Sequence, residues 1–421
     1  MKKLSKLILF VLIFLFTFQA IAQEQAKPKF EIKPYGFVVY DIYLDTYKSV
    51  DSRDGESYSY PSMPKFDKNG KDANVKTMLD MTSLTSRLGA KILGPDFFGA
   101  KTCGLFEMDF MGTKQDYVQL FTLRHAMINL RWEKSELIIG QTWHPIIVNE
   151  MIPSTVSFGA GAPFHPLNRS GQIRFTYHFS QFFRLTGAAV IHGLHRSTGV
   201  YDAQRNSGKP DVHLQLSMGD RKEFLAGFTA GYKWLTPRLY IDKDTISTNE
   251  TIGSYDLQAF IMVKPASTSI KLEAIYGQNL TYLSMIGGYG KKTGSGNLTD
   301  DYSYTNLRTF SIWGDIQQDI DKWTIGVFAG YQKLLGADDN YTSIKADKVT
   351  GTPDFFRDDN LSYIIRVSPR VVYKADALSI GLEYILTKAV YGSAWDAKHK
   401  VTETMDPVSN NRVLVRVAYN F

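Results

Sequence analysis

The sequence is short of the features that stabilise small secreted domains and of those that build helical membrane proteins. Cysteine occurs once, at Cys103, so no disulfide can form within the chain. Apolar stretches that approach membrane-spanning length are missing except at the extreme N-terminus, and charged residues make up 21% of the 421 residues. These scarcities exclude a disulfide-stabilised domain and a polytopic helical membrane protein. Aromatic residues are abundant at 13%, which excludes a disordered chain.

The N-terminal apolar stretch has the organisation of a secretory signal peptide. A lysine-rich start at residues 2–6 precedes the apolar run Leu7–Phe18, and Ala20–Ala22 supplies the small residues that signal peptidase accepts. Twelve helical residues rise only ~18 Å against a ~30 Å hydrocarbon core, which argues against a transmembrane anchor. We therefore expect residues 1–22 to be a cleaved signal peptide and residues 23–421 to form the mature protein.

Cleavage at this point leaves little net charge. The sequence has 48 Lys and Arg against 42 Asp and Glu, and residues 1–22 contain three lysines and no acidic residue. The mature chain thus has 45 basic and 42 acidic residues, a net charge of +3. No block of Lys or Arg accompanies this balance, so we expect no nucleic-acid partner.

Alternation of apolar and polar residues runs through the chain from Phe30 onward. The segment 412–421 is the clearest case, because Val413, Val415, Val417, Tyr419 and Phe421 occupy one face and polar residues dominate the other. A period of two with opposite chemistry on the two faces predicts a β-strand with one apolar and one wet side.

The connections between these segments alternate between short and long, and aromatic residues recur near the ends of the apolar faces. This combination is typical of outer-membrane barrels, in which turns are short on the periplasmic side and loops are long outside. We therefore predict an all-β fold: a transmembrane antiparallel β-barrel of about 16 strands, located in the outer membrane, with an aqueous lumen. The expected strands start near Tyr35, Thr77, Gly99, Val118, Leu137, Gln172, Arg184, Asp211, Phe224, Ile252, Ser269, Asn306, Trp323, Leu361, Leu378 and Asn411.

The polar faces of the predicted strands line the lumen, and basic residues outnumber acidic residues there by a modest margin. The pore-lining candidates on strands are Arg87, Lys91, His125, Arg131 and Arg174. Such a lumen favours anions. The alternative is a ladder of lumenal salt bridges with no net preference.

The connection 143–171 is the main functional candidate among the loops. It contains four prolines and more apolar residues than an exposed loop needs. We expect it to fold into the lumen and narrow it, which would offer His144, Glu150, His165 and Arg169 to the pore. An extracellular lid or a subunit contact is the alternative.

Motifs for enzymatic chemistry are absent from the sequence. It contains no G-x-S-x-G elbow, H-E-x-x-H helix or phosphate-binding loop, so we expect neither an enzyme nor a cofactor or metal site. The function that fits best is a porin: a passive channel for small hydrophilic solutes with mild anion preference. The alternative is a non-conducting adhesin or structural barrel that acts through its extracellular loops.

Four short motifs in order give the first 45% or so of the chain a resemblance to the DcaP-like trimeric outer-membrane porins. The motifs are Ser86–Gly89 (SRLG), Leu123–Ala126 (LRHA), Gly140–Trp143 (GQTW) and Gly171–Tyr177 (GQIRFTY). The resemblance implies a homotrimer of sixteen-stranded barrels that passes small, often negatively charged solutes past basic residues at a constriction. Carried over to matching positions, it implies Arg87, His125 and Arg174 on strands, with Arg169 in the loop. The chain departs from the family by lacking a helical N-terminal extension between Gln23 and Phe30.

Outward positions on the second to fourth strands fit a trimer independently. Arg124 falls on the apolar-parity face, where a charge facing lipid costs ~2–4 kcal/mol near the bilayer midplane. Ala100, Thr102 and Gly104 make the neighbouring face small rather than apolar, so all four residues are subunit-contact candidates. A strand bulge that reverses parity at Arg124 is the competing explanation. The other expected partners are outer-membrane lipid and lipopolysaccharide, and the barrel-assembly machinery through the C-terminal strand ending on Phe421.

Overall fold

The computed structural model describes residues 30–241, 244–292, 301–349 and 351–421. The predicted signal peptide, residues 1–22, and the segment 23–29 lie outside these residues. Within the described ranges, no helix is both long enough and apolar enough to pass through a membrane.

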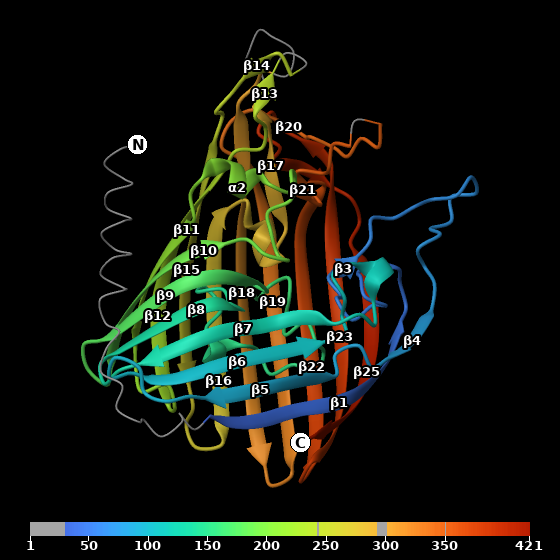
Figure 1. The fold of residues 1–421 in the computed structure, drawn as a ribbon. Helices are drawn as coiled ribbons and strands as arrows, with labels where there is room; N and C mark the ends of the chain where they lie inside the picture. Colours follow the sequence, from blue (N-terminus) through green and yellow to red (C-terminus); the bar gives the residue numbers. More distant parts are fainter. Residues whose placement is uncertain (1–29, 242–243, 293–300, 350) are drawn as a thin grey trace, which may run out of the picture.

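The described strands form a closed antiparallel barrel, as the alternation predicted (Figure 1). The barrel has sixteen wall positions, because β4 and β5 follow one another along the same edge of β1 and count as one. The wall consists of β1 (Glu31–Asp45), β4 and β5 (Met78–Thr82 and Arg87–Leu93), β6 (Lys101–Asp109), β7 (Thr122–Arg131), β8 (Ser135–Trp143), β9 (Arg169–His178), β10 (Phe183–Ile191), β11 (Asp211–Met218), β12 (Phe224–Leu235), β15 (Ile252–Val263), β16 (Thr268–Gln278), β18 (Tyr304–Ile320), β19 (Trp323–Ala337), β22 (Leu361–Ala375), β23 (Leu378–Trp395) and β25 (Val408–Asn420).

The first and last strands close the barrel. β1 pairs with β25 in antiparallel register from Phe37 opposite Asn420 to Asp45 opposite Arg412. Every wall strand therefore has a neighbour on both sides, and no strand edge is left to meet lipid unpaired.

Shorter elements lie in the connections between wall strands, most of them at the extracellular end. These are β2 (Ser49–Val50), β3 (Tyr60–Pro61), η1 (Gln115–Tyr117), η2 (Asn149–Met151), α2 (Ala203–Ser207), β13 (Tyr240–Ile241), β14 (Ile246–Ser247), η3 (Leu280–Leu283), β17 (Gly287–Lys292), β20 (Tyr341–Thr342), β21 (Phe356–Arg357) and β24 (Val401–Thr404). β17 pairs with β18, β20 and β21, so the sheet continues above the wall at this point.

The strands sort their side chains by face as the sequence pattern predicted. On β25, Val413 and Tyr419 are 40% and 54% exposed and point outward, whereas Arg412 and Leu414 are each 3% exposed and point into the lumen. A wet inner face and an apolar outer face are what a barrel needs in lipid.

The wall is uneven in height. Strands β6 to β10, which we call the low side, have 9 or 10 residues each. Strands β18, β19, β22 and β23, which we call the tall side, have 15 to 18. In Figure 1 the low side crosses the front of the barrel and the tall side rises behind it.

Candidate functional site

The connection between β8 and β9, residues 144–168, lies inside the barrel. Its backbone is held by inward side chains from strands across the lumen. These hydrogen bonds are Gln258 Nε2 to Ile146 O (2.6 Å), Lys271 Nζ to Ile152 O (2.6 Å), Ser154 N to Asp315 Oδ2 (3.0 Å), Ser157 N to Glu383 Oε2 (2.7 Å), Arg366 Nη1 to Ala162 O (2.7 Å), Gln332 Nε2 to Pro163 O (2.7 Å) and Ser311 Oγ to Phe164 O (2.9 Å). The donors and acceptors on the wall come from β15, β16 and the tall side. We call residues 144–168 the lumenal loop.

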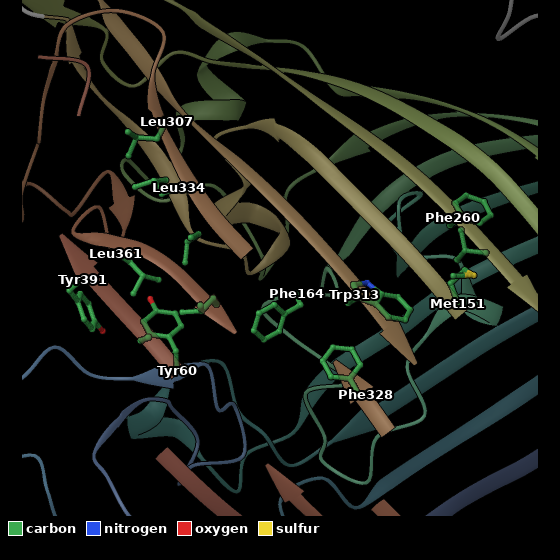
Figure 2. Close-up of a cluster of buried hydrophobic side chains, with 14 of the residues drawn as sticks. Tyr60, Met151, Phe164, Phe260, Leu307, Trp313, Phe328, Leu334, Leu361 and Tyr391 are labelled. Carbon is green, nitrogen blue, oxygen red and sulfur yellow. The ribbon is translucent and has the colours of Figure 1, made fainter. Parts of the chain in front are cut away.

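The lumenal loop seals its half of the lumen with apolar packing. Met151 and Phe164 join a buried cluster with Phe260, Trp313 and Phe328 of the wall (Figure 2). The rings of Trp313 and Phe328 stack with centroids 5.8 Å apart, and the Phe164 ring lies 6.2 Å from that of Phe328. A packed apolar interior of this kind excludes water and ions, so any passage must lie on the other side of the loop.

Small inward residues on the tall side make room for the loop. A Cβ added to Gly330 would lie 2.5 Å from Cγ of Phe164, and one added to Gly381 would lie 2.9 Å from Val156 Cγ1. Both glycines stand at positions whose strand parity points inward. The absence of a side chain at these two positions lets the loop approach the wall closely. Inward-facing glycines on the strands therefore indicate in the sequence where the loop packs.

A cavity of about 370 Å³ remains beside the loop at the extracellular end. Four arginines line it, namely Arg53, Arg169, Arg196 and Arg357, against the single carboxylate of Asp51. Among the described residues, none of these arginines has a carboxylate oxygen within the 4.0 Å of an ion pair. The Arg169 guanidinium lies 5.0 Å from the Trp143 ring, and Arg53 is held by the carbonyls of Met111 and Thr113 at 3.2 and 2.6 Å.

His195 lines the same cavity and responds to this positive field. Burial, followed by the positive charges of Arg169, Arg357 and Arg53, lowers the pKa of His195 to about 3. The ring is therefore neutral at physiological pH. The guanidinium groups of Arg169, Arg357 and Arg53 that contribute to this shift make the cavity attractive to anions.

A second basic cavity of about 250 Å³ lies at the short-turn end of the barrel. Arg131, Arg174, Arg184 and Arg221 line it together with Glu136. Trp143 lines this cavity, whereas its cross-strand partner Arg169 lines the extracellular one. The two cavities thus flank the Trp143–Arg169 pair from opposite ends.

The strand candidates predicted to line the pore fall into different surroundings. Arg174 lines the short-turn cavity and has no carboxylate within ion-pair distance among the described residues. Arg131 lines it too, but bonds Glu136 at 2.9 Å. Lys91 is exposed near the short-turn end.

The remaining two strand candidates, Arg87 and His125, lie beside Glu107, whose carboxylate points inward from β6. Nε of Arg87 is 3.5 Å from Oε1 of Glu107, and Nε2 of His125 is 3.8 Å from the same atom. His125 is 5% exposed and bonds Thr142 Oγ1 through Nδ1 at 3.0 Å. Both side chains point inward but next to a negative charge.

Arg124 corrects one expectation. The register of β6 against β7 shifts between Glu107 and Met108, and this bulge turns Arg124 inward, where it is 2% exposed. Its guanidinium bonds Glu107 at 2.7 Å and Asp109 at 2.6 Å. Arg124 is therefore not a subunit contact of the outer face, and the bulge explains its parity.

The other three subunit-contact candidates lie in different surroundings. Ala100 is fully buried in the turn that precedes β6, where its N–H and carbonyl pair with Phe97, so it offers no contact surface. Thr102 and Gly104 do share the outward parity of Phe106, which is 42% exposed. Their role as subunit contacts stays a prediction.

Two histidines of the lumenal loop are also placed differently from expectation. His144 and His165 are at most 1% exposed, and Nδ1 of His165 lies 3.3 Å from Oε1 of Glu273. Burial, with His213 and His192 nearby, holds the pKa of His144 well below its usual range. These rings hold the loop in place and are not offered to the pore.

Several other inward charges are paired. Arg370 forms a bidentate pair with Asp315 at 2.7 and 3.1 Å, and Arg412 and Arg416 pair with Asp45 and Asp41 at 2.7 and 2.6 Å. The expected alternative of a salt-bridge ladder therefore describes part of the wall. Across the described part of the chain, no group of three or more His, Cys, Asp or Glu side chains could hold a metal ion.

Arg53, Arg196 and Arg357 were missed at the level of sequence because they stand in long connections without alternation. Their neighbours in the cavity come from loops far apart in the chain, and no local sequence pattern indicates that these loops come together.

Residues 16–188 match the DcaP family of outer membrane proteins. The resemblance drawn from the four motifs is thereby confirmed over that part of the chain, and with it the location in the outer membrane. No match was found among curated proteins.

Solved structures share the fold of the whole barrel. The outer membrane channel DcaP of Acinetobacter baumannii superposes with a TM-score of 0.66 at 16% identity, over 95% of this chain and all of that one. The anion-selective porin from Comamonas acidovorans gives 0.55 at 9% identity, over 93% and 100%. OmpT of Vibrio cholerae in its trimer form gives 0.54 at 11% identity, over 93% and 99%. At these identities the likeness establishes a porin fold.

Proposed function

We propose that the protein is a porin: a passive diffusion channel for small hydrophilic solutes that prefers anions. The observation that carries the proposal is a set of arginines that, among the described residues, have no carboxylate within ion-pair distance. Arg53, Arg169, Arg196 and Arg357 line the extracellular cavity, and Arg174 and Arg184 line the short-turn cavity. Solutes pass between the lumenal loop and the low side, where the passage is narrow and the field is positive.

The constriction is supported by how the lumenal loop is held. Hydrogen bonds from seven wall residues and the apolar cluster around Phe164 anchor it across the lumen. A loop tied down in this way narrows the route without opening and closing, which suits passive diffusion.

Planar-bilayer recording tests the proposal directly. The wild-type protein should conduct, and its reversal potential in a KCl gradient should have the anion sign. Exchanging Arg53, Arg169 and Arg357 for Gln should move the reversal potential toward zero. A matched variant, K65Q/K68Q/K71Q, removes three charges from an exposed extracellular connection and should leave it unchanged.

Two outcomes would contradict the proposal in different ways. A cation-signed reversal potential in the wild type would overturn the anion preference alone. An absence of conductance from correctly folded barrels would overturn the channel and favour the adhesin alternative. In that case, truncation of an extracellular loop would abolish function without any change in permeability.

We also propose a homotrimer. It is supported by the trimer form of OmpT, which shares the fold, and by the small outward residues Thr102 and Gly104 on β6. Native mass spectrometry of the detergent-purified protein tests it, and a monomer would overturn it. Export by a cleaved signal peptide ending at Ala22, and assembly through the strand ending on Phe421, stay predictions.

A further inference from the structure

The extracellular rim is open above β8 and β9. Their connection, the lumenal loop, folds inward, so within the described part of the chain no loop stands on the rim between the β6–β7 connection and the β10–β11 connection. A cavity of about 930 Å³ occupies this opening. Thr113 and Lys114 line it from one connection and the segment 191–210 lines it from the other. We call it the rim cleft.

The rim cleft is strongly basic. Lys114, Arg196, Arg205 and Lys209 line it, against one carboxylate, that of Asp202. Lys114 forms an ion pair with Asp116, with 3.3 Å between Nζ and Oδ2. Among the described residues, the other three cations have no carboxylate within ion-pair distance, and Arg205 and Lys209 are exposed to solvent. The Arg196 guanidinium donates to the carbonyls of Gly193 and Tyr201 and lies 3.4 Å from the Tyr201 ring. The two exposed cations, Arg205 and Lys209, are therefore the ones available to an anionic ligand.

The rim cleft also meets the lipid-facing surface. Ile191 is the last residue of β10 on the outward face and is 52% exposed, and Tyr201 in the cleft wall is 72% exposed. The Lys209 ammonium lies 5.4 Å from the ring of Trp234, which shares the outward face of β12 with Tyr232. Aromatic rings at the extracellular end of outward faces mark the boundary of the outer leaflet.

We propose that the rim cleft binds the phosphorylated head group of a lipopolysaccharide molecule of the outer leaflet. Guanidinium and ammonium groups suit phosphate oxygens, and Arg can engage them with two parallel hydrogen bonds. Ile191 and Tyr201 supply apolar surface for the adjoining acyl chains. The cations stand at the membrane boundary, where the phosphates of that lipid lie.

A free anion on its way to the pore offers similar chemistry. The rim cleft and the extracellular cavity share Thr113, Leu194 and Arg196, so a solute could reach one from the other. The exposed apolar residues distinguish the two ligands, because a small hydrophilic anion gains nothing from Ile191. The lipid site does not rest on the ion preference of the pore.

The test is a binding titration with the full-length protein in detergent, followed by native mass spectrometry. The probe is bis-phosphorylated lipid A, with phosphate-free lipid A and inorganic phosphate as comparisons. Loss of two cations in R205Q/K209Q should weaken binding of the phosphorylated probe about thirtyfold, since each surface cation contributes about 1 kcal/mol toward an anionic lipid. R205K/K209R keeps both charges and should bind like the wild type.

The control K68Q/K71Q removes the same charge from the β1–β4 connection and should bind normally. Equal binding by wild type and R205Q/K209Q would overturn the proposal. So would wild-type binding of phosphate-free lipid A as tight as that of the phosphorylated probe. Binding of inorganic phosphate that is lost in R205Q/K209Q, with no greater affinity for lipid A, would assign the cleft to solutes instead. Reversal potentials of the same variants report separately on the pore.

Discussion

The tall and low sides of the barrel are built from the same kind of alternating strand but have different roles in the lumen. The tall side provides hydrogen-bonding side chains, paired charges and inward glycines that hold the lumenal loop, so its half of the lumen is filled. Both basic cavities lie toward the low side, where Arg169 and Arg174 keep their charges without a carboxylate partner. The difference indicates that the filled half determines how wide the passage is, and the open half determines what passes.

The largest effect should come from loosening the filled half. Exchanging Phe164 for Ala removes a buried ring from the cluster with Phe328 and should destabilise the packing by about 3–5 kcal/mol. The lumenal loop should then move, with higher and noisier single-channel conductance. Phe179→Ala removes a ring that is 63% exposed and serves as the control. Identical single-channel records for the two variants would show that the loop does not limit the passage.

Breaking a charge pair of the filled half should affect stability and not selectivity. Arg370→Gln leaves Asp315 buried without its guanidinium, which should cost about 3–5 kcal/mol. The thermal unfolding midpoint, followed by the gel mobility of heated and unheated samples, should fall. The reversal potential should stay at its wild-type value. A clear shift in reversal potential would mean that the tall side also faces the ion path.

Ion selectivity should change when arginines of the open half are replaced, and two of these arginines should contribute unequally. Removing one charge ~8 Å from the ion path changes the ion's energy by about 0.5 kcal/mol in water, about a factor of two in permeability ratio. Arg174→Gln should produce this change in full, whereas Arg87→Gln should produce less because Glu107 lies 3.5 Å from Arg87. Reversal potentials of the two variants under one salt gradient give the comparison. A larger effect for Arg87 would reverse the assignment.

A pH dependence of stability should come from His195. Its pKa in the folded protein is about 3, below the usual value of 6.5, so acidification protonates the unfolded chain first. Stability should therefore be fully retained above pH 6.5 and decline as the pH falls toward 3. His195→Gln should show a smaller difference between the unfolding midpoints at pH 7 and pH 4.5. An unchanged difference would show that burial and the neighbouring arginines do not lower the pKa of His195.

The barrel itself could be predicted from sequence almost strand by strand. The expected start at Trp323 is the observed start of β19, and those at Phe224 and Leu361 coincide with β12 and β22. Local alternation suffices there because each strand meets lipid on one face and water on the other. Arg124 shows where this fails, because a single bulge reverses parity and the sequence does not reveal where a bulge falls.

The candidate site was predictable only in part. Arg174 was identified from strand parity and Arg169 as a residue of the connection 143–171, both with support from the family resemblance, and they do line the basic cavities. His144 and His165 were expected in the pore but are buried as anchors of the loop. Arg53 and Arg357 were not identified, since loop residues have no parity from which to infer their direction.

The sequence by itself determined the barrel, its strand number and its outer-membrane location, because these depend on a period of two and on connection lengths. Tertiary structure alone decided which side of the lumen is filled and which charges stay unpaired. Both depend on contacts between residues far apart in the chain, such as Ser157 with Glu383 and Arg370 with Asp315. The hydrogen bond or ion pair that neutralises an inward charge exists only once the barrel has closed and the loop has folded into it.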